Sequence, residues 1–227
     1  MNYSFGVCPL CRHTSFLFYE VCLLCYAKLE QQKCKYVTPH FCSVCGEPLL
    51  HEDAQCQHPV TNHYLHRVFP YAKDVKQLIL LYKKSDIQRI SHTISHLIQT
   101  DYHMLELIYG RILCVPVPCS RQRISSTGWD PVTTILRKGE IPFLPLIVRT
   151  GSPPQKSLNR EQRLHMAQLA YSRNEQMVNA NKDRMEQYDA IVLFDDIVTT
   201  GSTVRVCIAL LEEIVSIPVI SFCVAVD

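Results

Sequence analysis

The sequence lacks long hydrophobic runs, a recognisable secretion signal and a strong excess of charge of one sign. It contains no run of roughly 18 consecutive apolar residues, so no membrane-spanning helix is expected. The first residues, Met1 to Cys8, have neither the basic nor the apolar region of a secretory signal, which predicts a cytoplasmic protein. The formal net charge of +2 is too small to indicate nucleic-acid binding by itself.

The composition indicates a globular protein that is rich in cysteine. The chain has 227 residues, 47% of them hydrophobic, which is enough for one ordinary domain and a small module. Because thiols stay reduced in the cytoplasm, the 12 cysteines are expected to bind metal rather than to form disulfides. Eight of them lie in the first 56 residues.

Three pairs of these amino-terminal cysteines have the Cys-x-x-Cys spacing: Cys8/Cys11, Cys22/Cys25 and Cys42/Cys45. The spacing lets two thiolates on one tight turn bind the same metal ion, and two such turns complete a structural site. The first two pairs, Cys8, Cys11, Cys22 and Cys25, therefore form one complete ligand set for zinc. An iron–sulfur cluster, or a site that has partly lost its metal, is the alternative interpretation.

Cys42, Cys45 and Cys56 indicate a second metal site. Three residues compete for its fourth position, and the ligands of the two sites can interleave: His58, His51 and Cys34. Metal binding would supply the folding free energy of so short a segment. We therefore predict a zinc-ribbon module over residues 1–58, with a structural or interaction role, and a second domain over residues 59–227.

The stretch from Ile191 to Thr203 is the most informative part of the chain. Ile191 to Phe194 predict a short strand buried in a parallel sheet, and two carboxylates, Asp195 and Asp196, follow it. A turn of small and hydroxyl residues comes next, and from Val204 the apolar residues have helical spacing. In such a strand–turn–helix, the glycine backbone and the free amides of the helix start bind phosphate. The alternative is that the aspartates only cap an ordinary helix.

This stretch resembles the phosphate- and ribose-binding loop of the type I phosphoribosyltransferases. The resemblance implies that Asp195 and Asp196 accept hydrogen bonds from the 2′ and 3′ hydroxyls of phosphoribosyl pyrophosphate, which is usually bound with Mg²⁺. It also implies that the turn binds the 5′-phosphate of that ligand through Thr199, Thr200, Gly201, Ser202 and Thr203.

Strands that alternate with helices predict an α/β fold with a mainly parallel sheet flanked by helices, as in the type I phosphoribosyltransferases. The expected strands are Tyr64–Pro70, Arg111–Val117, Phe143–Arg149 and Ile217–Val226. The expected helices are Asp74–Lys84 and Ser85–Thr100, and the polar segment Asn174–Tyr188 reads as a surface helix or linker. We expect His92, His96 and His103 to lie on the surface.

A second resemblance rests on the middle of the chain. The segment Pro116-Val117-Pro118 is followed by Arg121 and Arg123, and then by Thr127-Gly128-Trp129-Asp130. With the cysteine module and the acidic stretch, these residues resemble the ComF family, which comprises competence-associated, phosphoribosyltransferase-like proteins with an amino-terminal zinc module. Thr127, Trp129 and Asp130 replace the family's usual Arg, Phe and Asn, which weakens the implied pyrophosphate contact. Trp129 is suited to stacking on a base or to packing in the core.

The family also has a Gln…Leu…Arg pattern, which Gln155, Leu158 and Arg163 match within a segment of loop-like composition. In type I enzymes the equivalent loop closes over the bound sugar diphosphate. The basic residues Lys156, Arg160 and Arg163 can serve that closure or can contact a nucleic-acid backbone. The sequence leaves both uses open.

The ComF resemblance implies a competence protein that handles incoming single-stranded DNA during natural transformation, together with DNA-uptake or recombination proteins. Candidates for contact with pyrophosphate or DNA are Lys83, Arg121, Arg123, Gln155, Lys156, Arg160 and Arg163. A second hypothesis is an active phosphoribosyltransferase with an unidentified nitrogenous acceptor. A third is a non-catalytic module that senses phosphoribosyl pyrophosphate or a nucleotide.

Overall fold

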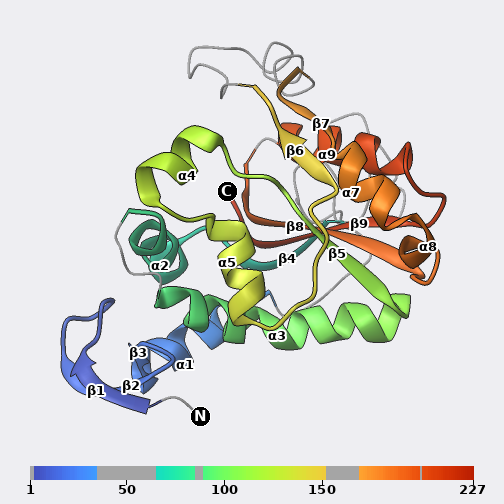
Figure 1. The fold of residues 1–227 in the computed structure, drawn as a ribbon. Helices are drawn as coiled ribbons and strands as arrows, with labels where there is room; N and C mark the ends of the chain where they lie inside the picture. Colours follow the sequence, from blue (N-terminus) through green and yellow to red (C-terminus); the bar gives the residue numbers. More distant parts are fainter. Residues whose placement is uncertain (1–2, 35–64, 85–88, 152–168, 200) are drawn as a thin grey trace.

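A four-stranded parallel sheet forms the centre of the molecule (Figure 1). The computed structural model describes residues 3–34, 65–84, 89–151, 169–199 and 201–227. The sheet has the order β4-β9-β8-β5, and each neighbouring pair is parallel. Its strands are β4 (Leu65–Pro70), β9 (Val219–Val226), β8 (Ala190–Val198) and β5 (Ile112–Pro116). The expected mixed α/β fold with a parallel sheet flanked by helices is confirmed.

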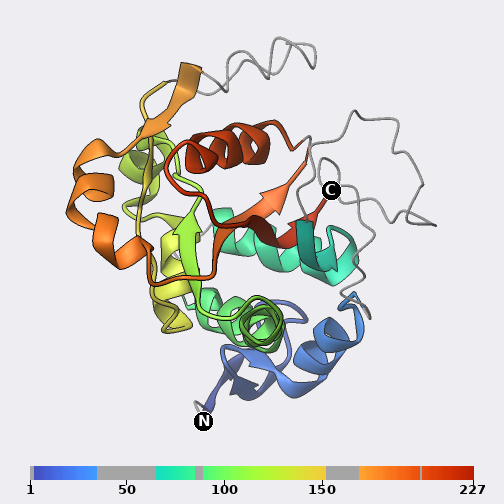
Figure 2. The same ribbon diagram turned by 90° about the vertical axis from the view of Figure 1, so that its right-hand side faces the viewer.

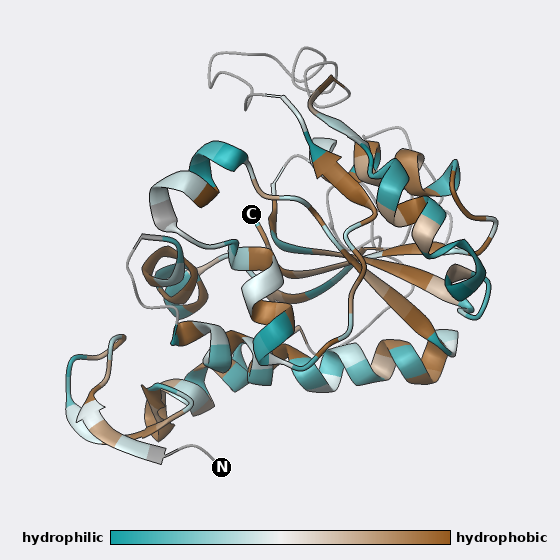
Figure 3. Ribbon diagram, viewed as in Figure 1, coloured by the Kyte–Doolittle hydropathy of each residue, from teal (hydrophilic) through white to brown (hydrophobic). Residues whose placement is uncertain are grey.

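Helices cover both faces of this sheet (Figures 1 and 2). One face packs against α2 (Lys73–Lys84), α3 (Ile90–Tyr109) and α5 (Pro131–Lys138). The other packs against α9 (Ser202–Glu212), with α7 (Glu175–Ala180) and α8 (Lys182–Met185) beside it. Val192 and Phe194 of β8 enter the first layer, whereas Ile191 and Leu193 enter the second. Burial on both faces explains why the strand is a continuous run of apolar residues. Figure 3 shows that the central strands are largely hydrophobic.

The segment Phe143–Arg149 does not form the expected strand of the main sheet. Only β6 (Ile147–Arg149) is extended, and it pairs antiparallel with β7 (Tyr171–Arg173) in a separate two-stranded ribbon. Phe143 makes one isolated bridge with Cys114 of β5. Pro142 and Pro145 explain the difference, because proline has no amide proton to donate to a strand ladder.

The helix expected to end at Thr100 continues to Tyr109. Tyr102 and Leu105 are buried, so the apolar face runs past the polar pair Thr100 and Asp101. Gly110 ends the helix with a φ of 79°, a conformation that glycine adopts without strain. The helix expected over Asp74–Lys84 is confirmed as α2. Among the helices of the described segments, none combines the length and the hydropathy needed to cross a bilayer.

A small antiparallel sheet and one helix form the amino-terminal part of the molecule. The strands are β1 (Tyr3–Val7), β2 (Thr14–Phe18) and β3 (Val21–Cys22), and α1 (Leu23–Gln31) follows them. Helix α1 packs against α2 and α3, and its Leu29 joins the main core. The boundary predicted near residue 58 lies outside the described residues.

His96 was expected to lie on the surface, but it packs against two tyrosines. Its ring stacks on Tyr19 with the centroids 4.1 Å apart, and its Nδ1 lies 2.5 Å from the hydroxyl of Tyr26. Both tyrosines belong to the amino-terminal part, so His96 of α3 connects that part to the helices that cover the central sheet. His103, by contrast, is exposed as expected and pairs with Glu106.

Candidate functional site

The acidic pair stands at the carboxyl end of the central strand β8. The sequence predicted a strand that ends at Phe194, but the strand continues through Asp195 and Asp196 to Val198. The reason is the long pairing with β9, whose register runs from Ile191 to Val198. Because successive side chains of a strand point to opposite faces, the two carboxylates have different neighbours.

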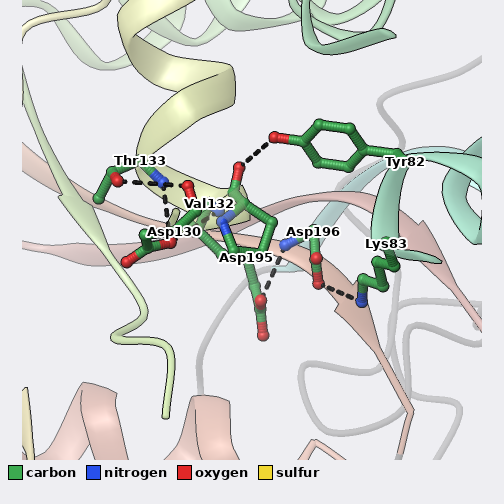
Figure 4. A network of polar contacts seen from close by, with 8 residues as sticks. Tyr82, Lys83, Asp130, Val132, Thr133, Asp195 and Asp196 are labelled. Atoms are coloured by element: carbon green, nitrogen blue, oxygen red, sulfur yellow. Dashed lines mark hydrogen bonds and ion pairs between the residues drawn. The ribbon is translucent and has the colours of Figure 1, made fainter. Parts of the chain in front are cut away.

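Asp196 forms an ion pair with Lys83, at the end of α2 (Figure 4). Lys83 Nζ lies 2.8 Å from Asp196 Oδ1, and the two side chains are 20% and 10% exposed. Lys83 was predicted to contact phosphate, and the structure places it at the acidic pair. An ammonium group has three donors, so Lys83 can hold Asp196 and still donate to a second anion.

The surroundings of Asp195 disfavour its charged form. Its pKa is raised above the usual value for an aspartate, first by burial and second by the negative charge of Asp196. The charge of Lys83 and the backbone amide of Asp196, which donates to Asp195 Oδ1 at 2.8 Å, partly offset this rise in pKa. Keeping both carboxylates charged in the free protein is therefore unfavourable. Hydrogen-bond donors from a ligand would relieve the repulsion.

We expect Asp195→Asn to stabilise the protein increasingly as the pH rises. A carboxyl group whose folded-state pKa is raised stabilises the fold fully below its unfolded pKa, and this contribution is lost as the pH rises through the folded pKa. Asparagine keeps the oxygen that accepts from the amide of Asp196 but carries no charge. Urea unfolding at roughly pH 5 and roughly pH 8 should show a larger gain for the variant at the higher pH. An equal gain at both pH values would contradict the raised pKa.

The Lys83–Asp196 pair is also expected to couple energetically. Lys83→Met leaves a carboxylate that is only 10% exposed without its cation and should cost about 2 kcal/mol of unfolding free energy. The double variant Lys83→Met/Asp196→Asn removes both charges and should recover part of that loss. Urea unfolding of the two single variants and the double variant measures this coupling. Additive effects would mean that the ion pair contributes nothing in solution.

The turn predicted to bind phosphate lies directly after the acidic strand. Gly201 is buried and has a φ of 70°, which explains why this position needs glycine. Helix α9 begins at Ser202, and its N-cap residue, Gly201, has no side chain that could cap the helix. The predicted apolar face of this helix is confirmed, because Val204, Cys207, Ile208 and Leu211 are buried. Thr199 is exposed, Ser202 and Thr203 are half-buried, and Thr200 lies outside the described residues.

Two residues next to this turn were not found by sequence reasoning. Arg149 of β6 lies over the ring of Tyr171 of β7, 5.3 Å from its centroid. Arg149 Nε is buried and makes no hydrogen bond within the described segments. The pKa of Tyr171 is raised, mainly by burial. The charge of Arg149 and a hydrogen bond with Thr203 lower this pKa, and the charge of Asp195 raises it. These side chains are therefore neighbours of Tyr171. The one available signal was that Arg149 directly follows an apolar run.

The segment that departs from the ComF pattern has a structural role. Asp130 caps α5, since its Oδ1 accepts from the amides of Val132 at 2.9 Å and Thr133 at 3.2 Å. Trp129 is 9% exposed and packs on Tyr82 with the ring centroids 4.8 Å apart. Of the two uses left open for Trp129, core packing is the one observed. Tyr82 in turn donates to the carbonyl of Pro131 at 2.7 Å (Figure 4).

The other predicted basic contacts are only partly described. Arg121 is exposed and Arg123 half-buried on the short helix α4 (Arg121–Thr127), which starts after Pro118. Gly128 ends this helix with a φ of 76°, which accounts for the glycine in the motif. The loop candidates lie outside the described residues: Gln155, Lys156, Arg160 and Arg163.

Four cysteines of the amino-terminal part come together as predicted. The sulfur atoms of Cys8, Cys11, Cys22 and Cys25 all lie within 4.8 Å of one another. The Cys11 and Cys22 sulfurs are 3.6 Å apart. In a tetrahedral zinc site with Zn–S bonds of about 2.3 Å, sulfur atoms are roughly 3.8 Å apart. The cluster therefore has the spacing of a closed, structural four-thiolate site.

The backbone around the cluster favours the thiolate form of Cys8, whereas burial raises the pKa of Cys22 and Cys25. The amide of Cys22 donates to Cys8 Sγ at 3.4 Å. Burial raises the pKa of Cys8, but hydrogen bonds from the backbone of Cys22, Cys11 and Leu10 outweigh it, and the pKa falls to about 7. The proposed second set, Cys42, Cys45, Cys56, His51 and His58, lies outside the described residues. Cys34 is separate from the first cluster, and its amide donates to the carbonyl of Val68 at 2.8 Å.

A cleft of about 320 Å³ lies elsewhere, between the end of α8 and the loop that joins α9 to β9. It is lined by Met185, Ile214 and Ile217, among others. These residues precede strands β8 and β9, so the cleft is at the amino-terminal edge of the sheet. In open α/β sheets ligands bind at the opposite, carboxyl edge, where Asp195 and Asp196 stand.

Comparison with known proteins adds no relative: no family model matches the chain, and the search of curated proteins finds no match. The fold, the acidic pair and the cysteine cluster are therefore the features that point to a function.

Proposed function

We propose that this protein binds a sugar phosphate of the phosphoribosyl pyrophosphate class and handles single-stranded DNA, as a cytoplasmic ComF-type competence protein with a type I phosphoribosyltransferase-like domain. One observation supports this most strongly. Asp195 and Asp196 stand near the carboxyl end of a central parallel strand, and Gly201 and the start of α9 follow a few residues later. Carboxylates for sugar hydroxyls and the backbone amides of a helix start for a phosphate thus lie close together in the chain.

A ribose seated over the end of β8 would meet Asp196 from the side of α2 and Asp195 from the side of α9. Its 5′-phosphate would accept from the amides at the start of α9, an arrangement that the helix dipole favours. Lys83 and Arg149 add cations on opposite sides of the sheet. Carboxylate oxygens are ligands that Mg²⁺ prefers, and Asp195 and Asp196 would hold the ion together with the ligand's phosphates.

A binding role without turnover is the second candidate, and Asp130 favours it. The carboxylate of Asp130 accepts hydrogen bonds from the first turn of α5. It also lies close enough to Asp196 for the two negative charges to repel each other. A carboxylate at the place where the family usually has a polar amide repels a pyrophosphate group. This substitution supports sensing of a phosphoribosyl ligand or nucleotide over phosphoribosyl transfer to an acceptor.

Calorimetry with phosphoribosyl pyrophosphate and Mg²⁺, with and without a short single-stranded DNA, tests the proposal. Binding in the micromolar range, weakened by added DNA, would mean that both ligands use one pocket. Binding of DNA alone, with affinity that falls steeply with salt, would place the DNA on basic surfaces instead. Failure to bind either ligand would contradict the proposed function. Release of pyrophosphate only when a nitrogenous acceptor is added would favour an active transferase.

The cysteine module has a supporting part in this proposal. A closed four-thiolate zinc site leaves no position for water or substrate, so it contributes structure and not chemistry. The module would position the DNA or a partner from the uptake or recombination machinery.

A further inference from the structure

The hairpin formed by β1 and β2 displays an aromatic pair to solvent. Phe5 and Phe16 are direct cross-strand partners. Their rings are 5.3 Å apart at an interplanar angle of 70°, and the residues are 69% and 66% exposed. Figure 1 shows this hairpin at the edge of the molecule, projecting away from the central sheet.

The exposed aromatic face is not the ordinary outer face of a hairpin. An antiparallel sheet packs one face on a core and turns a polar face to water. Here Leu17 provides the inner face and packs with Cys8, Val21 and the other cluster cysteines. The outer face nevertheless carries large apolar residues, and an exposed patch of this kind marks an interaction surface.

The residues that form this hairpin include no acidic side chain that would repel a polyanion. The chain contains no aspartate or glutamate before Glu20. Arg12 and His13 are both exposed in the turn that joins β1 to β2. Aromatic rings that stack on bases, beside cations that contact the backbone, are the usual components of a surface that binds single-stranded nucleic acid.

We propose that Phe5 and Phe16, flanked by Arg12, form a base-stacking platform for single-stranded nucleic acid. The inference rests on the DNA-handling part of the proposed function and assigns that contact to the amino-terminal hairpin instead of the acidic pocket. A protein partner would be expected to bring complementary charge or a larger apolar surface. Bases, however, need only a ring face and a neighbouring cation.

Fluorescence anisotropy with a labelled oligothymidine at low salt tests the platform. The variant Phe5→Ala/Phe16→Ala should weaken binding at least about fivefold, because one base–aromatic stack is worth roughly 1–3 kcal/mol. A matched control, Leu107→Ala/Ile108→Ala, removes two exposed apolar residues, 79% and 52% exposed, at the far end of α3. This control should bind like the wild type. Zinc content, measured for every variant, shows whether the cysteine cluster has stayed intact.

Two further variants separate stacking from general hydrophobic contact. Phe16→Trp should bind as tightly as the wild type or more tightly, and its fluorescence should be quenched by the oligonucleotide. Trp129 is only 9% exposed and gives a constant background. Phe16→Leu should lose affinity although it stays apolar, whereas wild-type affinity in Phe16→Leu would overturn the stacking role.

The possible failures are distinguishable. If the wild type binds no oligonucleotide, the DNA-handling function itself fails, and the platform fails with it. If the wild type binds and the double phenylalanine variant binds equally well, only the platform is overturned. If that variant instead converts a dimer to a monomer in size-exclusion chromatography while DNA binding is unchanged, the face joins two copies of the chain and the inference is wrong.

Discussion

The Cys22→Ser variant is expected to lose one zinc ion per chain and to unfold the amino-terminal part. Cys22 is one of four thiols whose sulfur atoms lie within 4.8 Å of one another. Its hydroxyl replacement does not ionise at neutral pH and is a poor zinc ligand. Structural zinc sites bind with about 10–16 kcal/mol of apparent free energy, and this binding free energy is folding free energy for such a small segment.

The loss of the ion should also destabilise the main domain. Leu29 of α1 belongs to the main core, and Tyr26 contacts His96 of α3. Gln32, at the end of α1, donates to Asp74 of α2 at 2.9 Å. A module that unfolds withdraws these contacts, so the melting temperature of the whole chain should fall.

Metal analysis by mass spectrometry and thermal unfolding together measure the effect of Cys22→Ser. The control is Cys119→Ser, which makes the same chemical change at a half-buried cysteine outside the cluster. It should keep the wild-type zinc content. Wild-type zinc content and melting in Cys22→Ser would refute the four-cysteine site.

The second large effect is expected for the double variant Asp195→Asn/Asp196→Asn. Its affinity for phosphoribosyl pyrophosphate should be at least about a hundredfold lower than that of the wild type. Hydrogen bonds to charged groups contribute about 1.5–3 kcal/mol each, so losing two of them weakens binding by at least about two orders of magnitude. The amide side chains keep similar shapes. The asparagine in place of Asp195 would keep the oxygen that accepts from the next backbone amide, so the fold should persist.

Calorimetry and circular dichroism of this double variant separate binding from folding. The matched control is Asp183→Asn/Asp189→Asn, which removes the same two charges from exposed positions near the opposite edge of the sheet. This control should bind the ligand like the wild type. Undiminished binding in Asp195→Asn/Asp196→Asn would mean that the pocket lies elsewhere in the molecule.

The parts of the fold that were predictable depend on neighbours in sequence. The apolar run Ile191–Phe194 identified the central strand because both of its faces are buried. The helical spacing after Val204 identified the buried face of α9 for the same reason. The misplaced end of α3 and the interrupted strand at Phe143–Arg149 show the limit of this reasoning, because periodicity fades where polar residues or prolines intervene.

The composition of the candidate site was predictable only in part. Asp195, Asp196 and Gly201 stand in one short motif, so their proximity followed from the sequence. Lys83 was singled out as a phosphate contact, but its partner Asp196 is 113 residues away. Arg149 was missed because its neighbour Tyr171 comes from a different strand.

The alternation of strands and helices, the acidic motif and the first set of metal ligands could be predicted from the sequence alone, since all three depend on spacings within a few residues. The three-dimensional fold was needed to establish the strand order, the pairing of Lys83 with Asp196 and the packing of Tyr19 and Tyr26 on His96. The fold also showed that Trp129 packs in the core and that Phe5 and Phe16 face water. These features depend on which distant segments the sheet and its helices bring together, and no local pattern of residues encodes that choice.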